Sequence, residues 1–223
     1  MMEKFKFIDL FSGIGGFHQA MVNLGGKCVF ASEIDKEAIK TYQYNYGIDS
    51  AHDITKTKEE DIPKHDVLCA GFPCQAFSKA GQQLGFTDKT KGTLFFEIIR
   101  ILKYHKTPYI ILENVRNLTS HDNGKTWIII KNALNEIGYI ISEDPFIISP
   151  HQLGIPQLRE RVIILGVHKD VGIKNLNITL PNYDKKEIVF FNSGILEQGD
   201  VDKKYYIQTN VRDLLSIKSS FQK

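Results

Sequence analysis

In the stretch FKFIDLFSGIGG, Phe5 to Gly16, a short apolar run is followed by a glycine-rich turn. The run Phe5–Leu10 predicts a buried β-strand, and the residues from Gly16 to Leu24 predict a helix that ends at Gly25-Gly26. Glycines between a strand and a helix permit a tight turn and let a ligand approach the main chain. This unit predicts an α/β fold, but the glycines alone do not distinguish a ligand site from an ordinary turn.

The same alternation of strand and helix patterns continues outward from this unit. It predicts a mostly parallel sheet with helices on both faces, a Rossmann-like α/β fold. The predicted strands are 28–32, 48–54, 67–70 and 109–112, then 139–148 paired with 161–167, and the further helices are 36–46, 93–104 and 126–137. Because the pattern weakens after Val167, we expect one domain over residues 1–168 and the start of a second region over 169–223.

Composition favours one globular protein of ordinary charge. The 223 residues are 42% hydrophobic and 24% charged, with a net charge of +2, which neither indicates nor excludes a local basic face. Three cysteines without framework spacing argue against a disulfide scaffold or a cysteine-based zinc site, so we expect no metal. Residues 1–10 lack a signal-peptide pattern and no apolar run is long enough to cross a bilayer. We therefore expect a cytoplasmic protein without a membrane association.

Acidic residues after the first strands predict an adenosine site. Glu33 lies twenty residues after Gly13, at the end of the second predicted strand, where a carboxylate can accept hydrogen bonds from both ribose hydroxyls. Asp53 follows the third predicted strand and can accept from an adenine amino group. The alternatives are an acid at a helix N-terminus beside Asp35 for Glu33, and an ordinary loop residue for Asp53. The pattern does not distinguish a dinucleotide from S-adenosylmethionine.

A second group of residues predicts reactive chemistry at neighbouring strand ends. Cys74 follows the apolar run 67–70 on a glycine-hinged turn, although most free cysteines are structural. Glu113 ends the next predicted strand, so the two side chains can face one pocket. A buried Glu tends to keep its proton and can act as an acid. The alternative is that Glu113 caps a helix or pairs with Arg116.

Basic residues flank these strand ends. Alternation predicts Arg159 and Arg161 on the same face, where they can hold a carboxylate, a phosphate or a base carbonyl; the alternative is a surface charge cluster. The stretch 75–92 fits a closing loop with glycine hinges, or a solvated surface loop. Five residues of this stretch are candidate DNA contacts: Gln75, Ser78, Lys79, Lys89 and Lys91.

Four segments together resemble a known family. FIDLFSGIGG at 7–16, GFPCQAFS at 71–78, ENV at 113–115 and QLRER at 157–161 are similar, in order and spacing, to the motifs of the DNA (cytosine-5) methyltransferases of bacterial restriction–modification systems. The resemblance covers about residues 5–167. It implies a methyltransferase fold that binds S-adenosyl-L-methionine and methylates C5 of a cytosine in double-stranded DNA.

The resemblance also implies a role for each site residue. Cys74 adds to cytosine C6, which makes C5 nucleophilic, while Glu113 binds N3 and the exocyclic amine and donates or shares a proton. Arg161 contacts O2, and Arg159 orients Glu113 or the loop. The target base has to be flipped out of the duplex. The implied cofactor contacts are Phe11, Gly13, Ile14, Gly16, Glu33, Asp53, Ile54, Pro73 and Leu94, together with Ile34, which stands where relatives often have an aromatic residue.

Members of the family continue into a target-recognition region and a final pair of motifs, which residues 169–223 do not display. We expect residues 169–223 to be the start of a truncated target-recognition or partner-docking region. We therefore expect a catalytic chain that needs a second polypeptide for recognition. An inactive remnant or accessory protein that binds cofactor or a partner is the alternative, and the intact Cys74, Glu113 and Arg161 argue against it. A nicotinamide oxidoreductase would leave the Pro-Cys and Arg-Glu-Arg segments unexplained. An RNA methyltransferase of the same family stays open.

Overall fold

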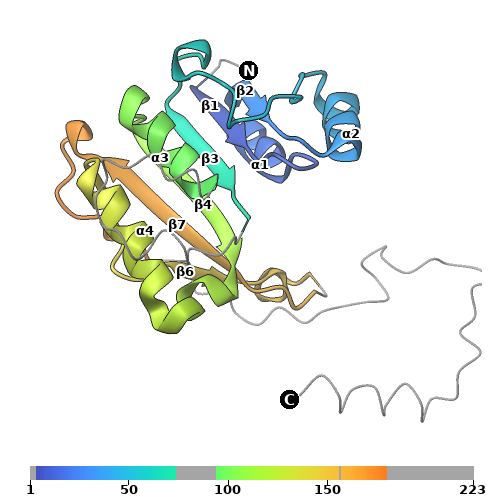
Figure 1. Ribbon diagram of the computed structural model, residues 1–223. Coiled ribbons are helices and arrows are strands. Elements are labelled where there is room, and N and C mark those ends of the chain that lie inside the picture. Colours follow the sequence, from blue (N-terminus) through green and yellow to red (C-terminus); the bar gives the residue numbers. More distant parts are fainter. Residues whose placement is uncertain (1–3, 74–93, 156, 180–223) are drawn as a thin grey trace, which may run out of the picture.

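The computed structural model describes residues 4–73, 94–155 and 157–179 (Figure 1). Their strands form one seven-stranded sheet in the order β2-β1-β3-β4-β7-β5, with β6 also paired to β7. The strands are β1 (Phe5–Leu10), β2 (Gly26–Ser32), β3 (Val67–Gly71), β4 (Tyr109–Val115), β5 (Tyr139–Ile141), β6 (Phe146–Ile148) and β7 (Arg161–His168).

The sheet is mostly parallel, as the sequence predicts. Strands β2, β1, β3 and β4 run parallel, whereas β7 is antiparallel to β4, and both β5 and β6 are antiparallel to β7. The predicted strand 139–148 is therefore two short strands, and both pair with β7 as expected. This arrangement brings the carboxyl ends of β1, β2, β3 and β4 to one edge of the sheet, which is where ligands bind in open α/β folds.

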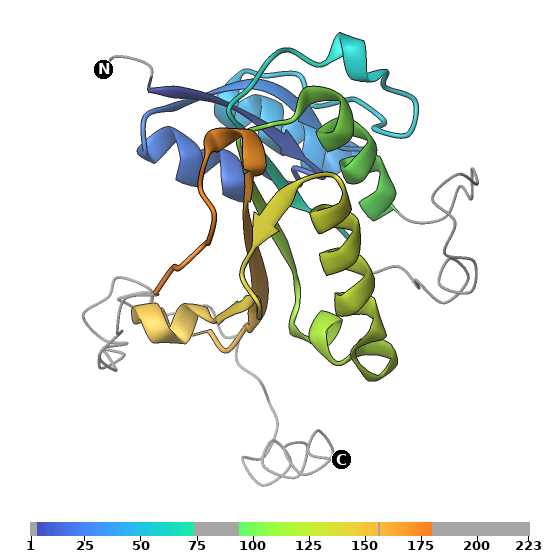
Figure 2. The same cartoon turned by 90° about the vertical axis from the view of Figure 1, so that its left-hand side faces the viewer.

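Helices cover both faces of the sheet (Figure 2). Each helix boundary differs from its predicted position by at most one residue. The helices are α1 (Gly16–Asn23), α2 (Lys36–Tyr46), α3 (Leu94–His105) and α4 (Lys125–Glu136). Short 3₁₀ turns connect the larger elements: η1 (Glu59–Asp61), η3 (Arg116–Thr119), η4 (His121–Gly124), η5 (Pro150–Leu153) and η6 (Lys169–Val171).

The core has two parts, one on each side of the sheet. On β1, Phe7 packs with Met21 of α1 and Tyr42 of α2, whereas Ile8 and Leu10 face the opposite side. The side chains of α3 and α4 pack on that opposite side. This alternation follows from the two-residue period of a strand, and it buries both faces of β1.

The predicted strand over 48–54 is wrong. The segment makes one backbone bond to the end of β2, in which the Glu33 amide donates to the Ser50 carbonyl over 2.8 Å. Beyond that point the side chains of Asp49 and Asp53 accept from amides two residues ahead and turn the chain locally. Short acidic side chains that bond nearby amides compete with a strand ladder, and here the turns prevail.

None of the helices within the described ranges is long and apolar enough to cross a membrane.

Candidate active site

The turn between β1 and α1 forms the floor of the predicted cofactor site. Phe11, Gly13 and Gly15 have positive φ angles of 55°, 53° and 96°, a conformation that costs about 1–3 kcal/mol for a residue such as Phe. A Cβ atom at Gly15 would lie 2.2 Å from Cε2 of Tyr46, so the turn requires glycine there. A Cβ at Gly13 or Gly16 would meet nothing within 4 Å. The main chain of the turn is therefore open to a ligand.

Glu33 ties the end of β2 to this glycine turn. Its Oε2 accepts from the Gly13 amide over 2.8 Å, and its Oε1 accepts from the amides of Ile34 and Asp35 over 2.8 and 3.0 Å. The residue that caps α2 is Asp35, so Glu33 is not the helix-capping acid. An ionised carboxylate has about four acceptor positions. The amides of Gly13, Ile34 and Asp35 occupy three of them. One position remains for a ligand hydroxyl.

Asp53 uses its carboxylate within a local turn. Its Oδ1 accepts from the amide and hydroxyl of Thr55 over 3.1 and 2.6 Å, and its Oδ2 lies 3.0 Å from Nζ of Lys56. The side-chain hydrogen bonds from Thr55 and Lys56 lower the pKa of Asp53. This geometry is that of an ordinary loop aspartate, so a contact with adenine stays a prediction.

The other predicted cofactor contacts differ in exposure. Ile34 and Ile14 are 71% and 64% exposed at the carboxyl edge of the sheet, although large apolar side chains are usually buried. Ile54 is buried, at 4% exposure, in the α2–β3 connection. Pro73 and Leu94 flank residues 74–93 on either side. The structure joins Glu33 directly to the glycine turn and leaves two exposed isoleucines beside it.

Glu113 lies where the sequence predicts, at the end of β4 beside the end of β3. Gly71 of β3 is in register with Glu113, and a Cβ at Gly71 would be 3.4 Å from Oε2 of Glu113. Nε of Arg161 on β7 lies 2.7 Å from Oε1 of Glu113. Arg116 instead pairs with Glu160 over 2.6 Å, so the alternative partner for Glu113 is wrong.

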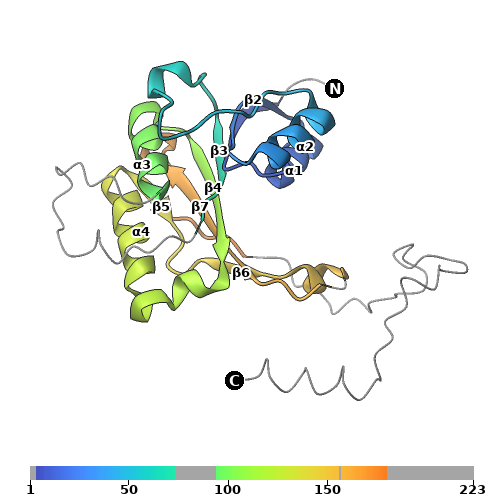
Figure 3. The ribbon, with the colours of Figure 1, turned by 45° about the vertical axis from the view of Figure 1, so that its right-hand side comes forward.

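Burial raises the pKa of Glu113, and the charges of Arg161 and Arg159 oppose the rise. This is the direction expected for an acid that keeps its proton. β7 begins at Arg161, so Arg159 lies outside the strand and the alternation predicted for the two arginines does not apply to it. Its backbone amide donates to Oγ of Ser149 over 3.0 Å, in the segment between β6 and β7 that projects from the sheet (Figure 3).

Asn114 has a positioning contact that sequence reasoning missed. Its side-chain amide donates to the Phe72 carbonyl over 2.8 Å, which joins the end of β4 to the residue before Pro73. Its Oδ1 accepts from the Val115 amide over 2.8 Å. A buried Asn at the end of an otherwise apolar strand is the signal that could have indicated this role, since buried polar groups need partners.

Cys74 lies outside the described residues, as do the five predicted DNA contacts Gln75, Ser78, Lys79, Lys89 and Lys91. The other two cysteines, Cys28 and Cys69, are free and buried. Burial raises the pKa of both thiols, that of Cys28 to about 11, so neither readily forms a thiolate. Within the described ranges, no group of three or more His, Cys, Asp or Glu residues could hold a metal ion.

Comparison with known proteins gives a consistent family. The family profile described as C-5 cytosine-specific DNA methylase matches residues 5–222. The type II methyltransferase M.HpaII of Haemophilus parainfluenzae is 49% identical over 218 residues, which are 96% of this chain and 59% of that protein. M.HhaI of Haemophilus parahaemolyticus is 42% identical over 208 residues, which are 92% of this chain and 62% of that protein.

Among solved structures, a DNMT2 variant from Spodoptera frugiperda superposes with a TM-score of 0.65 at 25% identity. The match covers 89% of this chain and 61% of that one. The chain thus spans about three fifths of the length of M.HpaII and M.HhaI.

Proposed function

The chain belongs to the C-5 cytosine-specific DNA methylase family, and we propose that it is the catalytic chain of a DNA (cytosine-5) methyltransferase. One observation carries this proposal. Gly71, three residues before Cys74 in the sequence, lies beside Glu113 in the register of β3 and β4. Glu113 is paired with Arg161. A nucleophile and an acid on neighbouring strand ends are what addition to a pyrimidine ring requires.

The residues around the glycine turn fit S-adenosylmethionine. The open main chain at Gly13 and Gly16 suits backbone contacts with the cofactor. The remaining acceptor position of Glu33 suits a ribose hydroxyl. The exposed side chains of Ile14 and Ile34 suit an apolar ring face. When bound, this cofactor supplies an electrophilic methyl group. Phe11, Asp53, Ile54, Pro73 and Leu94 complete the proposed set of contacts.

In the proposed mechanism the thiolate of Cys74 forms a bond to cytosine C6, and electron density moves to C5. Glu113 holds N3 and the exocyclic amine and donates a proton, so that negative charge does not accumulate on the ring. Arg161 holds the Glu113 carboxyl group and contacts O2, while Arg159 orients the same site. C5 then takes the methyl group as the bond between that methyl and the cofactor breaks, which leaves a neutral thioether. Solvent water accepts the C5 proton as the C5–C6 double bond re-forms and the Cys74 thiolate is expelled, and N3 returns its proton to Glu113. The raised pKa of Glu113 and the buried state of the other two cysteines support these roles.

Double-stranded DNA is the proposed substrate. Gln75, Ser78, Lys79, Lys89 and Lys91 are the proposed contacts to it. We propose further that a second polypeptide supplies target recognition. Residues 1–168 are the proposed catalytic domain, and residues 169–223 are the proposed start of a target-recognition or partner-docking region. The support for a second polypeptide is that residues 169–223 do not display the target-recognition region and final motifs of the family. The cytoplasm is the proposed location, because the DNA substrate of a bacterial enzyme lies there.

The test is transfer of a labelled methyl group from S-adenosylmethionine to mixed-sequence DNA, with the product identified as 5-methylcytosine after digestion to nucleosides. The chain is assayed alone and then with a recognition region taken from a relative, and Cys74→Ser is the matched inactive variant. An RNA of the same base composition is assayed in parallel. We expect methylation of DNA only in the mixture, and none with Cys74→Ser.

Each other result contradicts a defined part of the proposal. Methylation by the chain alone would show that no second polypeptide is needed. Methylation that persists in Cys74→Ser would reject the nucleophile. A complete lack of methylation with cofactor binding intact would favour a remnant or accessory protein, and methylation of RNA in place of DNA would reject the substrate.

A further inference from the structure

The connection between α2 and β3 carries two proposed cofactor contacts, Asp53 and Ile54, without a strand to support them. It is shaped by bonds within itself. The amides of Lys56 and Thr57 donate to the Asp53 carbonyl over 2.9 and 3.0 Å, and the Asp53 carboxylate accepts from Thr55. These bonds define a turn over residues 53–57, but they do not attach the turn to the rest of the molecule.

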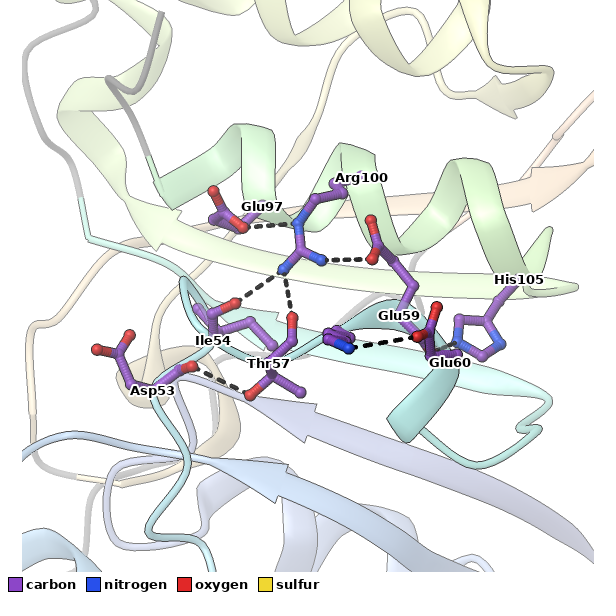
Figure 4. A network of polar contacts seen from close by, with 9 residues as sticks. Asp53, Ile54, Thr57, Glu59, Glu60, Glu97, Arg100 and His105 are labelled. Carbon is purple, nitrogen blue, oxygen red and sulfur yellow. Dashed lines mark hydrogen bonds and ion pairs between the residues drawn. The ribbon is translucent and has the colours of Figure 1, made fainter. Parts of the chain in front are cut away.

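The side chain of Arg100 makes that attachment (Figure 4). Its Nη2 donates to the carbonyls of Ile54 and Thr57 over 2.8 and 3.0 Å. Its Nη1 lies 2.9 Å from Oε2 of Glu59, and its Nε lies 2.8 Å from Oε2 of Glu97. The guanidinium group therefore contacts two main-chain carbonyls of the turn, the Glu59 carboxylate that follows the turn, and the Glu97 carboxylate on its own helix.

The helix that carries Arg100 is firmly held in the core. Helix α3 buries Ile98, Ile101 and Leu102 against the sheet and begins at Leu94, itself a proposed cofactor contact. Ile54 belongs to the same apolar cluster. Burial opposes ionisation of Glu59, yet a backbone amide and the Arg100 guanidinium together lower the pKa of this carboxylate. The ion pair thus adds to the attachment.

We propose that Arg100 is a positioning residue that holds the 53–57 turn where Asp53 and Ile54 contact the adenosine part of the cofactor. The proposal rests on the proposed function, because it concerns the same cofactor site. Arg100 itself does not touch the cofactor. A lysine cannot replace it fully. Its single ammonium group lacks the planar array of N–H donors with which a guanidinium can bind two carbonyls and two carboxylates at once.

Calorimetric titration of the full chain with S-adenosylmethionine tests this role. We expect Arg100→Met to raise the Kd about tenfold, the effect of losing charged hydrogen bonds that orient a binding loop, and Arg100→Lys to raise it less. The control is Lys131→Met, which removes the ion pair between Lys131 on α4 and Glu143. An unchanged Kd for Arg100→Met, or an equal rise for Lys131→Met, overturns the proposal.

A double-mutant cycle separates positioning from general destabilisation. Asp53→Ala should weaken cofactor binding in the wild-type background and have little further effect in Arg100→Met, because the turn is already displaced there. Additive effects would mean that Arg100 acts independently of Asp53, and they would overturn the proposal.

Amide hydrogen exchange without cofactor distinguishes a failure of this inference from a failure of the proposed function. Arg100→Met should accelerate exchange at Lys56 and Thr57, while the amides of α3 stay protected and report an intact fold. Unchanged exchange at Lys56 and Thr57 overturns the attachment itself. Accelerated exchange in a chain whose wild type binds no S-adenosylmethionine overturns the cofactor role together with the proposed function.

Discussion

At the scale of single residues, the carboxyl side chain of Asp9 stands out because it is fully buried within β1. Burial raises its pKa to about 8, although the His18 backbone amide and the Tyr42 hydroxyl act in the opposite direction. The Tyr42 hydroxyl donates to Oδ2 of Asp9 over 3.5 Å and lies 2.7 Å from Nδ1 of His18. Asp9 is therefore mostly protonated at neutral pH.

This raised pKa predicts a loss of stability with increasing pH. The folded state favours the protonated acid, so the contribution of Asp9 is complete below pH 3.8 and is lost as the pH rises through 8. Asp9→Asn does not titrate. We expect the stability of the wild type relative to Asp9→Asn to fall by up to about 1.4 kcal/mol per pH unit within this window. Urea unfolding of both proteins from pH 4 to 9 measures it, and a constant difference would contradict the prediction.

Glu113 carries the second residue-level prediction. Glu113→Gln keeps the shape of the side chain but removes its titration, so we expect methyl transfer to fall about 100-fold or more with cofactor affinity unchanged. Single-turnover transfer and calorimetry measure the two quantities. The control is Glu160→Gln, because Glu160 pairs with Arg116 and not with the proposed acid. A rate within twofold of the wild type would exclude Glu113 as the proton donor.

At the scale of elements, strand ends bring the site together. Gly71 of β3 lies opposite Glu113 of β4, and Arg161 opens β7 opposite Val115. Asn114 joins the same two parallel strands through the Phe72 carbonyl. Parallel strands with a shared carboxyl edge can collect residues that are distant in sequence. On the proposed cofactor side, Glu33 after β2 joins the β1–α1 turn through the Gly13 amide.

The start of α1 supplies the prediction at this scale. Gly15 has φ 96°, and a Cβ atom added there would lie 2.2 Å from the Tyr46 ring. A Cβ atom added at Gly16 would meet nothing within 4 Å. We expect Gly15→Ala to lower the free energy of unfolding by about 1–3 kcal/mol and Gly16→Ala to change it by less than about 1 kcal/mol. Thermal and urea unfolding of the two variants compare them. Equal effects would show that the turn does not need its left-handed glycine.

At the scale of the whole molecule, one sheet separates two apolar clusters. The larger cluster contains side chains from α3, α4 and the central strands, and the smaller contains Phe7, Met21 and Tyr42. The sheet centre is therefore where stability should be concentrated, while the carboxyl edge keeps exposed apolar residues such as Ile34. A rigid centre with an open edge suits a scaffold that binds ligands at that edge.

Leu112 tests this distribution of stability. It is fully buried on β4, between β3 and β7. We expect Leu112→Ala to lower the free energy of unfolding by about 3 kcal/mol, the usual cost of a cavity in a core. Leu158→Ala is the matched control, because Leu158 is 80% exposed, and it should change stability by less than about 0.5 kcal/mol. Similar losses in both variants would contradict this description of the core.

Local patterns predicted most of the fold. Helix bounds followed from apolar periodicity and from glycines such as Gly47 that end helices. The strand ends carrying Glu33 and Glu113 followed from short apolar runs. The hydrophobic pattern alone predicts a strand over 48–54, whereas the turns that the side chains of Asp49 and Asp53 form prevent it. That error added one strand to the predicted sheet, which the structure does not contain over these residues.

The sequence by itself determined the motifs, the order of the elements and the residue types at the site, because these depend on neighbours along the chain. Only the tertiary structure decided which charges pair. It set Glu113 against Arg161 and left Arg116 with Glu160, and it fastened the 53–57 turn to Arg100. Such pairs join residues far apart in sequence, so their choice depends on strand register and helix placement, which no local pattern contains.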